Sequence, residues 1–247
     1  MTNKNIPGLI TVRTSSSRLP NKCLLPFGDC NVIEHVIRRT KHFMIEPIIC
    51  TSTDSSDDIL IEIAKKENVN YFRGPLNNKL LRWHDCANYF GLQDFHTVDA
   101  DDPFFDGNEM HRSMNLLRSG SYDIVCPTES SSAGGASVGY SLTSKIVHLA
   151  IKNLHQDTDT EMMWYFIDKI EKRKSIILDE MNINRPKVRL TLDYEEDYWL
   201  LRTIQRLVGS FKERAEIDNL FITNPDLYKI NWFHNDEWKN AQLSKKI

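Results

Sequence analysis

The chain has 247 residues, a formal net charge of −3 and a hydrophobic fraction of 40%. These values are ordinary for a folded globular protein with one large domain, and they argue against global disorder. Because nucleic-acid-binding proteins are usually basic, we expect no nucleic-acid partner, and any anion site has to be a local cluster of cations.

Short β-type runs alternate with helical patterns through the first half of the chain. Strands are expected at 8–12, 46–51, 69–72, 95–99 and 123–126. Helices are expected at 32–43, 57–66 and 106–117, where apolar residues recur at helical spacing. This alternation predicts an α/β fold, with a mainly parallel twisted sheet and helices on both faces.

The pattern loosens in the second half. Residues 130–139 are rich in Ser, Gly and Ala, which favours a binding loop. Later expectations are helices at 143–154 and 160–171, a strand at 188–192 and a helix at 195–208. We therefore expect one domain, 1–247, in three parts: a nucleotide-binding half (1–126), an acceptor-binding and dimerisation subregion (127–187), and a returning strand with C-terminal helices (188–247).

The five cysteines are widely spaced and form no CxxC pair. This pattern indicates neither a disulfide framework nor a zinc site, so we expect reduced thiols and a cytoplasmic protein. The apolar runs are too short for a signal peptide or a membrane span, and no membrane association is expected.

The segment RTSSSRLPNK, residues 13–22, follows the first expected strand. It carries Arg13, Arg18 and Lys22 together with a run of hydroxyl side chains. Ligands of parallel α/β sheets bind beyond the carboxyl ends of the strands, where this loop would lie. The composition suits a nucleoside triphosphate, although a solvated serine-rich loop would look the same. The loop has neither the P-loop ending nor the GxGxxG spacing.

Carboxylates are expected at the same edge of the sheet. Asp99, Asp101 and Asp102 end or follow one strand, and Asp193 follows the strand at 188–192. Mg²⁺ binds one or two carboxylates together with phosphate oxygens and water. Taken individually, Asp102 or Asp106 before one helix and Asp193 before the next could equally be helix caps. Asp99 and Asp101 also fit the DxD pattern of metal-dependent glycosyltransferases, which leaves that class as a rival.

The string ITVRTSSSRLPNKCLLPFG resembles the opening of the CMP-Kdo synthetase-like cytidylyltransferases, in particular their spore-coat polysaccharide biosynthesis branch. The similarity continues through IICTSTDSSDDILIEIAKK, YFRG and DADDPFFD, and it returns at VRLTLDYEEDYWLL. It implies a nucleotide-diphospho-sugar transferase-like fold and a Mg²⁺-dependent enzyme that transfers CMP from CTP and releases pyrophosphate. Asn21 departs from the family pattern, which usually has Gly there.

The resemblance also implies roles for individual residues. Arg13, Arg18 and Lys22 match the triphosphate-binding cations, and Asp101 and Asp193 match the metal-binding aspartates. The nucleotide-binding candidates beside them are Ser15, Ser16, Ser17, Ser52, Arg73 and Arg82.

The acceptor half departs most from the family pattern. Glu161 aligns with a family Glu, but Met162 replaces the usual His. The expected acceptor is a small acidic compound, either a 2-keto-3-deoxy sugar acid or a phosphate or phosphonate. Relatives often dimerise through this half, so a homodimer is expected. A non-catalytic nucleotide-binding module remains a further alternative.

Overall fold

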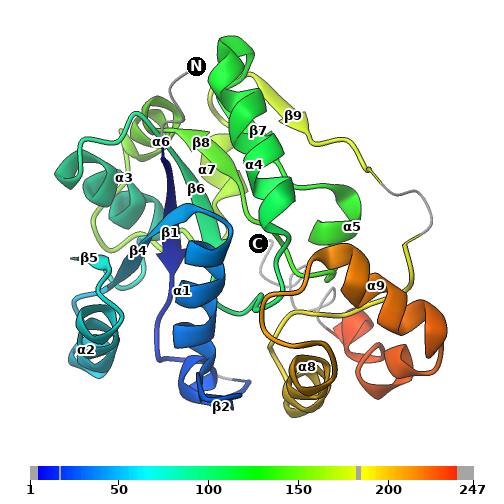
Figure 1. The fold of residues 1–247 in the computed structure, drawn as a ribbon. Helices are drawn as coiled ribbons and strands as arrows, with labels where there is room; N and C mark the ends of the chain where they lie inside the picture. Colours follow the sequence, from blue (N-terminus) through cyan, green and yellow to red (C-terminus); the bar gives the residue numbers. More distant parts are fainter. Residues whose placement is uncertain (1–4, 17, 182–184, 238–247) are drawn as a thin grey trace.

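The computed structural model describes residues 5–16, 18–181 and 185–237. In this part of the chain a seven-stranded sheet has the order β5-β4-β1-β6-β8-β7-β9 (Figure 1). Its strands are β1 (Ile6–Thr11), β4 (Ile45–Ser52), β5 (Asn70–Gly74), β6 (Asp94–Asp99), β7 (Ile124–Cys126), β8 (Ser141–Thr143) and β9 (Ser175–Ile177). Only β8 runs antiparallel to its described neighbours, β6 and β7. The expected mainly parallel sheet is confirmed.

Helices cover both faces of this sheet, as expected. The helices are α1 (Val32–His42), α2 (Asp58–Lys66), α3 (Lys79–Tyr89), α4 (Gly107–Leu116), α5 (Glu129–Ser132), α6 (Ser144–Ile151), α7 (Trp164–Ile167), α8 (Glu195–Val208) and α9 (Arg214–Thr223). Apolar residues of α1, α2 and α4 pack into one core against the sheet. Residues of α3, α6 and α7 form a second core on the opposite face, and α8 and α9 belong to a third.

The strand register sets the edge at which ligands can bind. Thr11, at the end of β1, lies opposite Cys50 of β4 and Asp99 of β6. The loops that leave these three parallel strands therefore emerge side by side. The loop at residues 13–22, the predicted phosphate loop, and the acidic DADD segment (residues 99–102) are consequently neighbours, although some eighty residues of sequence separate them.

Two expected elements differ in the structure. The segment 188–192 has no regular secondary structure and joins no strand of the described sheet; two of its amides instead bond to loops, Leu190 N to Gly134 O (2.8 Å) and Leu192 N to Asp101 O (2.7 Å). The helix expected at 160–171 is reduced to α7. Thr160 is held outside the helix because its amide bonds to Asn77 O and its hydroxyl accepts from Leu80 N.

A short hairpin and a turn of 3-10 helix shape the phosphate loop. Strands β2 (Pro26–Phe27) and β3 (Cys30–Asn31) form the hairpin, and η1 (Lys22–Leu24) precedes it. Asn21 enters η1 with a φ of 54°, a left-handed conformation that Gly favours and Asn tolerates. The departure from the family's Gly therefore preserves the turn that presents Lys22.

All five cysteines are free thiols. None of the helices in the described ranges has the length and hydropathy needed to cross a bilayer.

Candidate active site

A cleft of about 680 Å³ lies beyond the carboxyl ends of β1 and β6. The phosphate loop, the DADD segment and the segment that ends at Asp193 form one part of its wall. The start of α3 and residues from 132–140 and 159–164 form the rest. Eight predicted site residues line it: Arg13, Ser15, Ser16, Arg18, Lys22, Arg82, Asp101 and Asp193.

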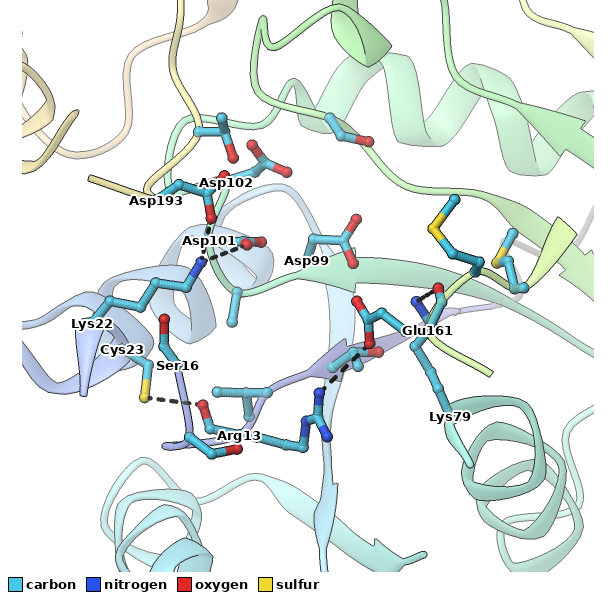
Figure 2. Close-up of a pocket in the computed structure, with 18 of the residues that line it drawn as sticks. Arg13, Ser16, Lys22, Cys23, Lys79, Asp99, Asp101, Asp102, Glu161 and Asp193 are labelled. Atoms are coloured by element: carbon cyan, nitrogen blue, oxygen red, sulfur yellow. Dashed lines mark hydrogen bonds and ion pairs between the residues drawn. The ribbon is translucent and has the colours of Figure 1, made fainter. Parts of the chain in front are cut away.

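Lys22 joins the two predicted metal-binding aspartates (Figure 2). Its Nζ donates to Asp101 Oδ2 at 2.8 Å and to Asp193 Oδ1 at 3.0 Å. Arg18 reaches the same Asp193 oxygen, with Nη2 at 2.5 Å. The structure thus brings together the cations of the phosphate loop and two acids that are far away in the sequence.

These contacts change the ionisation of the groups. Burial by itself raises the pKa of Asp193, but Lys22 and Arg18 outweigh it and lower the value to about 2. Burial likewise acts to lower the pKa of Lys22, and the charges of Asp101 and Asp193 raise it above its ordinary value. At neutral pH Lys22 and Asp193 therefore both carry full charges.

The carboxyl groups of Asp99, Asp101 and Asp102 crowd together at the end of β6. Burial, reinforced by the charge of Asp101, raises the pKa of Asp99 to about 6. The same two causes raise the pKa of Asp102 well above its usual range. One oxygen of Asp102 is buried without a hydrogen-bond partner among the described residues. The arrangement therefore favours additional positive charge in this part of the cleft.

Asp193 is positioned by a buried ion pair behind it. Arg189 is fully buried and forms a two-pronged pair with Asp197, at 2.8 and 3.0 Å. Asp197 accepts from the amides of Asp193 and Tyr194 at the start of α8. Asp197, rather than Asp193, thus performs the helix-capping task, which leaves the Asp193 carboxylate directed at Lys22 and Arg18.

The helix-cap alternative holds for Asp106, at the start of α4. Asp106 accepts from the amides of Asn108 and Glu109, whereas Asp101 lines the cleft.

Ser52 is buried beneath the phosphate loop and does not line the cleft. Its hydroxyl donates to Asp57 Oδ2 at 2.5 Å. Asp57 also accepts from the amide and hydroxyl of Thr14, both at 2.8 Å. Burial acts to raise the pKa of Asp57, but these hydrogen bonds lower it. Asp57 therefore connects the start of the phosphate loop to β4. Its position in an expected helix did not indicate this role.

The remaining predicted arginines have different surroundings. Arg73 lies outside the cleft wall and pairs with Asp58 at 2.7 Å. Arg82 lines the cleft but is almost completely buried, and it donates to the carbonyls of Pro75 and Leu76. Arg13 also donates to Leu76 O at 2.9 Å and reaches Glu161 at 3.5 Å.

Two of the three predicted serines of the loop, Ser15 and Ser16, are among the described residues. Ser15 and Ser16 line the cleft, so their hydroxyls are available to a ligand. Ser17 lies outside the described residues.

Several cleft residues were not singled out from the sequence. Lys79 donates from Nζ to Glu161 O at 3.1 Å (Figure 2), and it lies one turn before Arg82 on α3. Its spacing of three residues from Arg82, a predicted site residue, was the indication in the sequence that Lys79 could reach the cleft. Tyr140 packs edge-on against Trp164, with 5.1 Å between ring centroids, and both line the cleft. Nothing local marks Tyr140, because only the fold brings β8 beside β6.

Comparisons with known proteins identify a family model and relatives that this chain matches. A family model described as cytidylyltransferase matches residues 8–135. The uncharacterized protein MJ1063 of Methanocaldococcus jannaschii is 25% identical over 92% of this chain and 94% of its own length. The spore coat polysaccharide biosynthesis protein SpsF of Bacillus subtilis is 23% identical, over 88% and 94%.

Solved structures share the fold. A cytidylyltransferase from Leptospira borgpetersenii superposes with a TM-score of 0.78 at 23% identity, covering 91% of this chain and 96% of the other. The CTP complex of CMP:2-keto-3-deoxy-manno-octonic acid synthetase superposes with a TM-score of 0.61 at 11% identity, covering 82% and 99%.

Proposed function

This chain belongs to the cytidylyltransferase family, and on that premise we propose that it transfers CMP from CTP to an oxygen of a small acidic acceptor. It is accordingly a nucleotidyltransferase that uses CTP. The observation that carries the proposal is the convergence of Arg18 and Lys22 with Asp101 and Asp193 in one cleft. The proposed acceptors are a 2-keto-3-deoxy sugar acid and a phosphate or phosphonate compound.

The phosphate loop supplies the positive charge that the reaction needs. The acceptor oxygen attacks the α-phosphorus of CTP, the α–β phosphoanhydride bond breaks, and pyrophosphate leaves. Arg13, Arg18 and Lys22 line the cleft and would neutralise the triphosphate and the departing pyrophosphate. Ser15 and Ser16 would donate hydrogen bonds to phosphate oxygens.

The acids of the site fit a divalent cation, which we propose to be Mg²⁺. One oxygen each of Asp101 and Asp193 lies within 3.0 Å of the same ammonium nitrogen, so both carboxylates already converge on one cation. The described residues contain no group of three or more His, Cys, Asp or Glu side chains that could hold a metal. Phosphate oxygens and water would complete the ligand set, as is usual for Mg²⁺. When bound, the ion stabilises negative charge on the phosphates.

The other end of the cleft would receive the acceptor. Ser132 and Ser137 contribute hydroxyls, and Tyr140 and Trp164 contribute aromatic surface. The likeness to the spore coat protein supports a product that enters polysaccharide biosynthesis.

A pyrophosphate-release assay tests the proposal. Each of the four nucleoside triphosphates is offered with sugar acids, phosphates and phosphonates. We expect release with CTP and one acceptor class, and a loss of about 10²–10³-fold in Arg18→Ala, as for removal of one charge-stabilising donor elsewhere. Arg206→Ala, on the exposed side of α8, is the matched control. Binding of UDP- or GDP-sugars with no CTP binding would instead identify a glycosyltransferase, and CTP binding without turnover a binding module.

We also propose a homodimer formed through the 127–187 subregion. Ile177 and Met181 are 53% and 74% exposed there, and β9 is an edge strand of the described sheet. Light scattering tests this, because Ile177→Asp should convert the dimer to a monomer. The five free thiols support the cytoplasm as the proposed location.

A further inference from the structure

We propose that Lys22 acts as an internal counter-cation, which occupies the divalent-metal position until a nucleoside triphosphate draws it away. Metal and nucleotide would then bind as a mutually dependent pair. The inference rests on the proposed function, since it concerns the order in which that site is filled.

The ammonium group of Lys22 has no donor left for a ligand. A lysine ammonium carries three N–H donors. In the structure they serve Asp101 Oδ2 at 2.8 Å and Asp193 Oδ1 at 3.0 Å (Figure 2), and Leu192 O at 2.7 Å. To bind a phosphate oxygen, Lys22 must give up at least one of these acceptors.

The same contacts leave little room for a free metal ion. Mg²⁺ binds carboxylate oxygens at about 2.0–2.1 Å, so an ion held by both aspartates would lie against the ammonium nitrogen. Asp193 is further neutralised by Arg18 at 2.5 Å on one oxygen and by Arg189 at 3.5 Å on the other. Without nucleotide, an arriving metal would meet one positive charge between the carboxylates and two more beside them.

A triphosphate changes this balance. Its oxygens provide new acceptors for Lys22, whose side chain is long and flexible and begins on η1 at the cleft wall. Once Lys22 turns to the phosphates, Asp101 and Asp193 become available to the metal that accompanies the nucleotide. Because coupling of this kind is reciprocal, each ligand strengthens the binding of the other.

The test measures metal binding with no nucleotide present. Mn²⁺, used as the probe, is titrated into the protein and the free ion is followed by electron paramagnetic resonance. We expect wild-type protein to bind Mn²⁺ weakly and Lys22→Met to bind it at least tenfold more tightly. Lys79→Met removes the same charge from the same cleft without removing a hydrogen bond to Asp101 or Asp193, and its gain should be far smaller than that of Lys22→Met. Adding Asp101→Asn to Lys22→Met should abolish the gain.

Equal Mn²⁺ affinity in wild type and Lys22→Met would overturn the proposal, as would an equal gain in Lys79→Met. If Lys22→Met does not fold, Lys22→Gln replaces it, because its amide retains a donor for Leu192 O. A second readout is the melting temperature, which Mn²⁺ should raise more in the Lys22 variant than in wild type. The comparison contains no CTP, so its outcome is separate from that of the CTP-dependent assay.

Discussion

Acid should destabilise the fold through His96, which is completely buried behind the cleft wall. Its Nε2 contacts the carbonyl oxygen of Val138, and its Nδ1 lies 2.8 Å from Ser141 Oγ. A carbonyl only accepts, so Nε2 carries the proton and Nδ1 accepts from the Ser141 hydroxyl. The neutral ring is thereby fixed, and it holds the segment that carries Tyr140 against β6.

The magnitude follows from the pKa. Burial lowers the pKa of His96 from 6.5 to about 4. The folded value lies below the unfolded one, so the stabilisation is present above pH 6.5 and is lost as the pH falls towards 4. At pH 4.5 the loss amounts to about 2.5 kcal/mol. His35 is a second histidine of this kind, since burial lowers its pKa to about 4 as well.

Urea unfolding at pH 7.5 and pH 4.5 measures the effect. We expect the free energy of unfolding of His96→Gln to fall by roughly 2.5 kcal/mol less than that of wild type over this interval, because Gln does not titrate. His155→Gln, an exposed position, is the control and should follow wild type. If wild type and His96→Gln lose the same free energy, the assignment of a buried neutral His96 is wrong.

Three further variants test other parts of the structure. Asp101→Asn should reduce Mg²⁺-dependent pyrophosphate release by about 10²–10³-fold, and a metal titration that matches wild type would remove Asp101 from the site. Arg189→Met removes the ion-pair partner of the buried Asp197, which costs about 3–5 kcal/mol of stability. Calorimetry should therefore show a melting temperature roughly 6–20 °C lower, and a decrease of less than about 2 °C would contradict this. Gly139→Ala should unfold or strongly destabilise the chain, because its φ is 80° and the new Cβ would lie 1.9 Å from Thr97 O; a melting curve equal to that of wild type would refute the fit.

The early elements were predictable because their information is local. Helix α1 begins at Val32, and a capping box between Asn31 and Glu34 satisfies the backbone amides of its first turn. Its apolar residues recur on one face. Strands β1, β4 and β6 are short buried runs between polar turns. Periodicity and turn chemistry are properties of neighbouring residues, so they can be read from the sequence.

The later elements depended on distant partners. The segment at 188–192 alternates like a strand, yet its described hydrogen bonds go to loops. Thr160 looks helical in sequence, but bonds to Asn77 and Leu80 remove it from α7. β8 and β9 are only three residues long, and each exists because a neighbouring strand lies beside it. The residue pattern within a segment does not indicate which distant residues that segment will contact.

The sequence by itself determined the α/β class, the family and the two halves of the site, because the RTSSSRLPNK loop and the acids after β6 each occupy a stretch whose chemistry is evident residue by residue. The tertiary structure alone decided how those halves meet. It placed Lys22 between Asp101 and Asp193, assigned helix capping to Asp197, and put Ser52 under the loop instead of in the cleft. Charge interactions depend on distance in space, and only the folded sheet, which aligns the ends of β1 and β6, sets those distances.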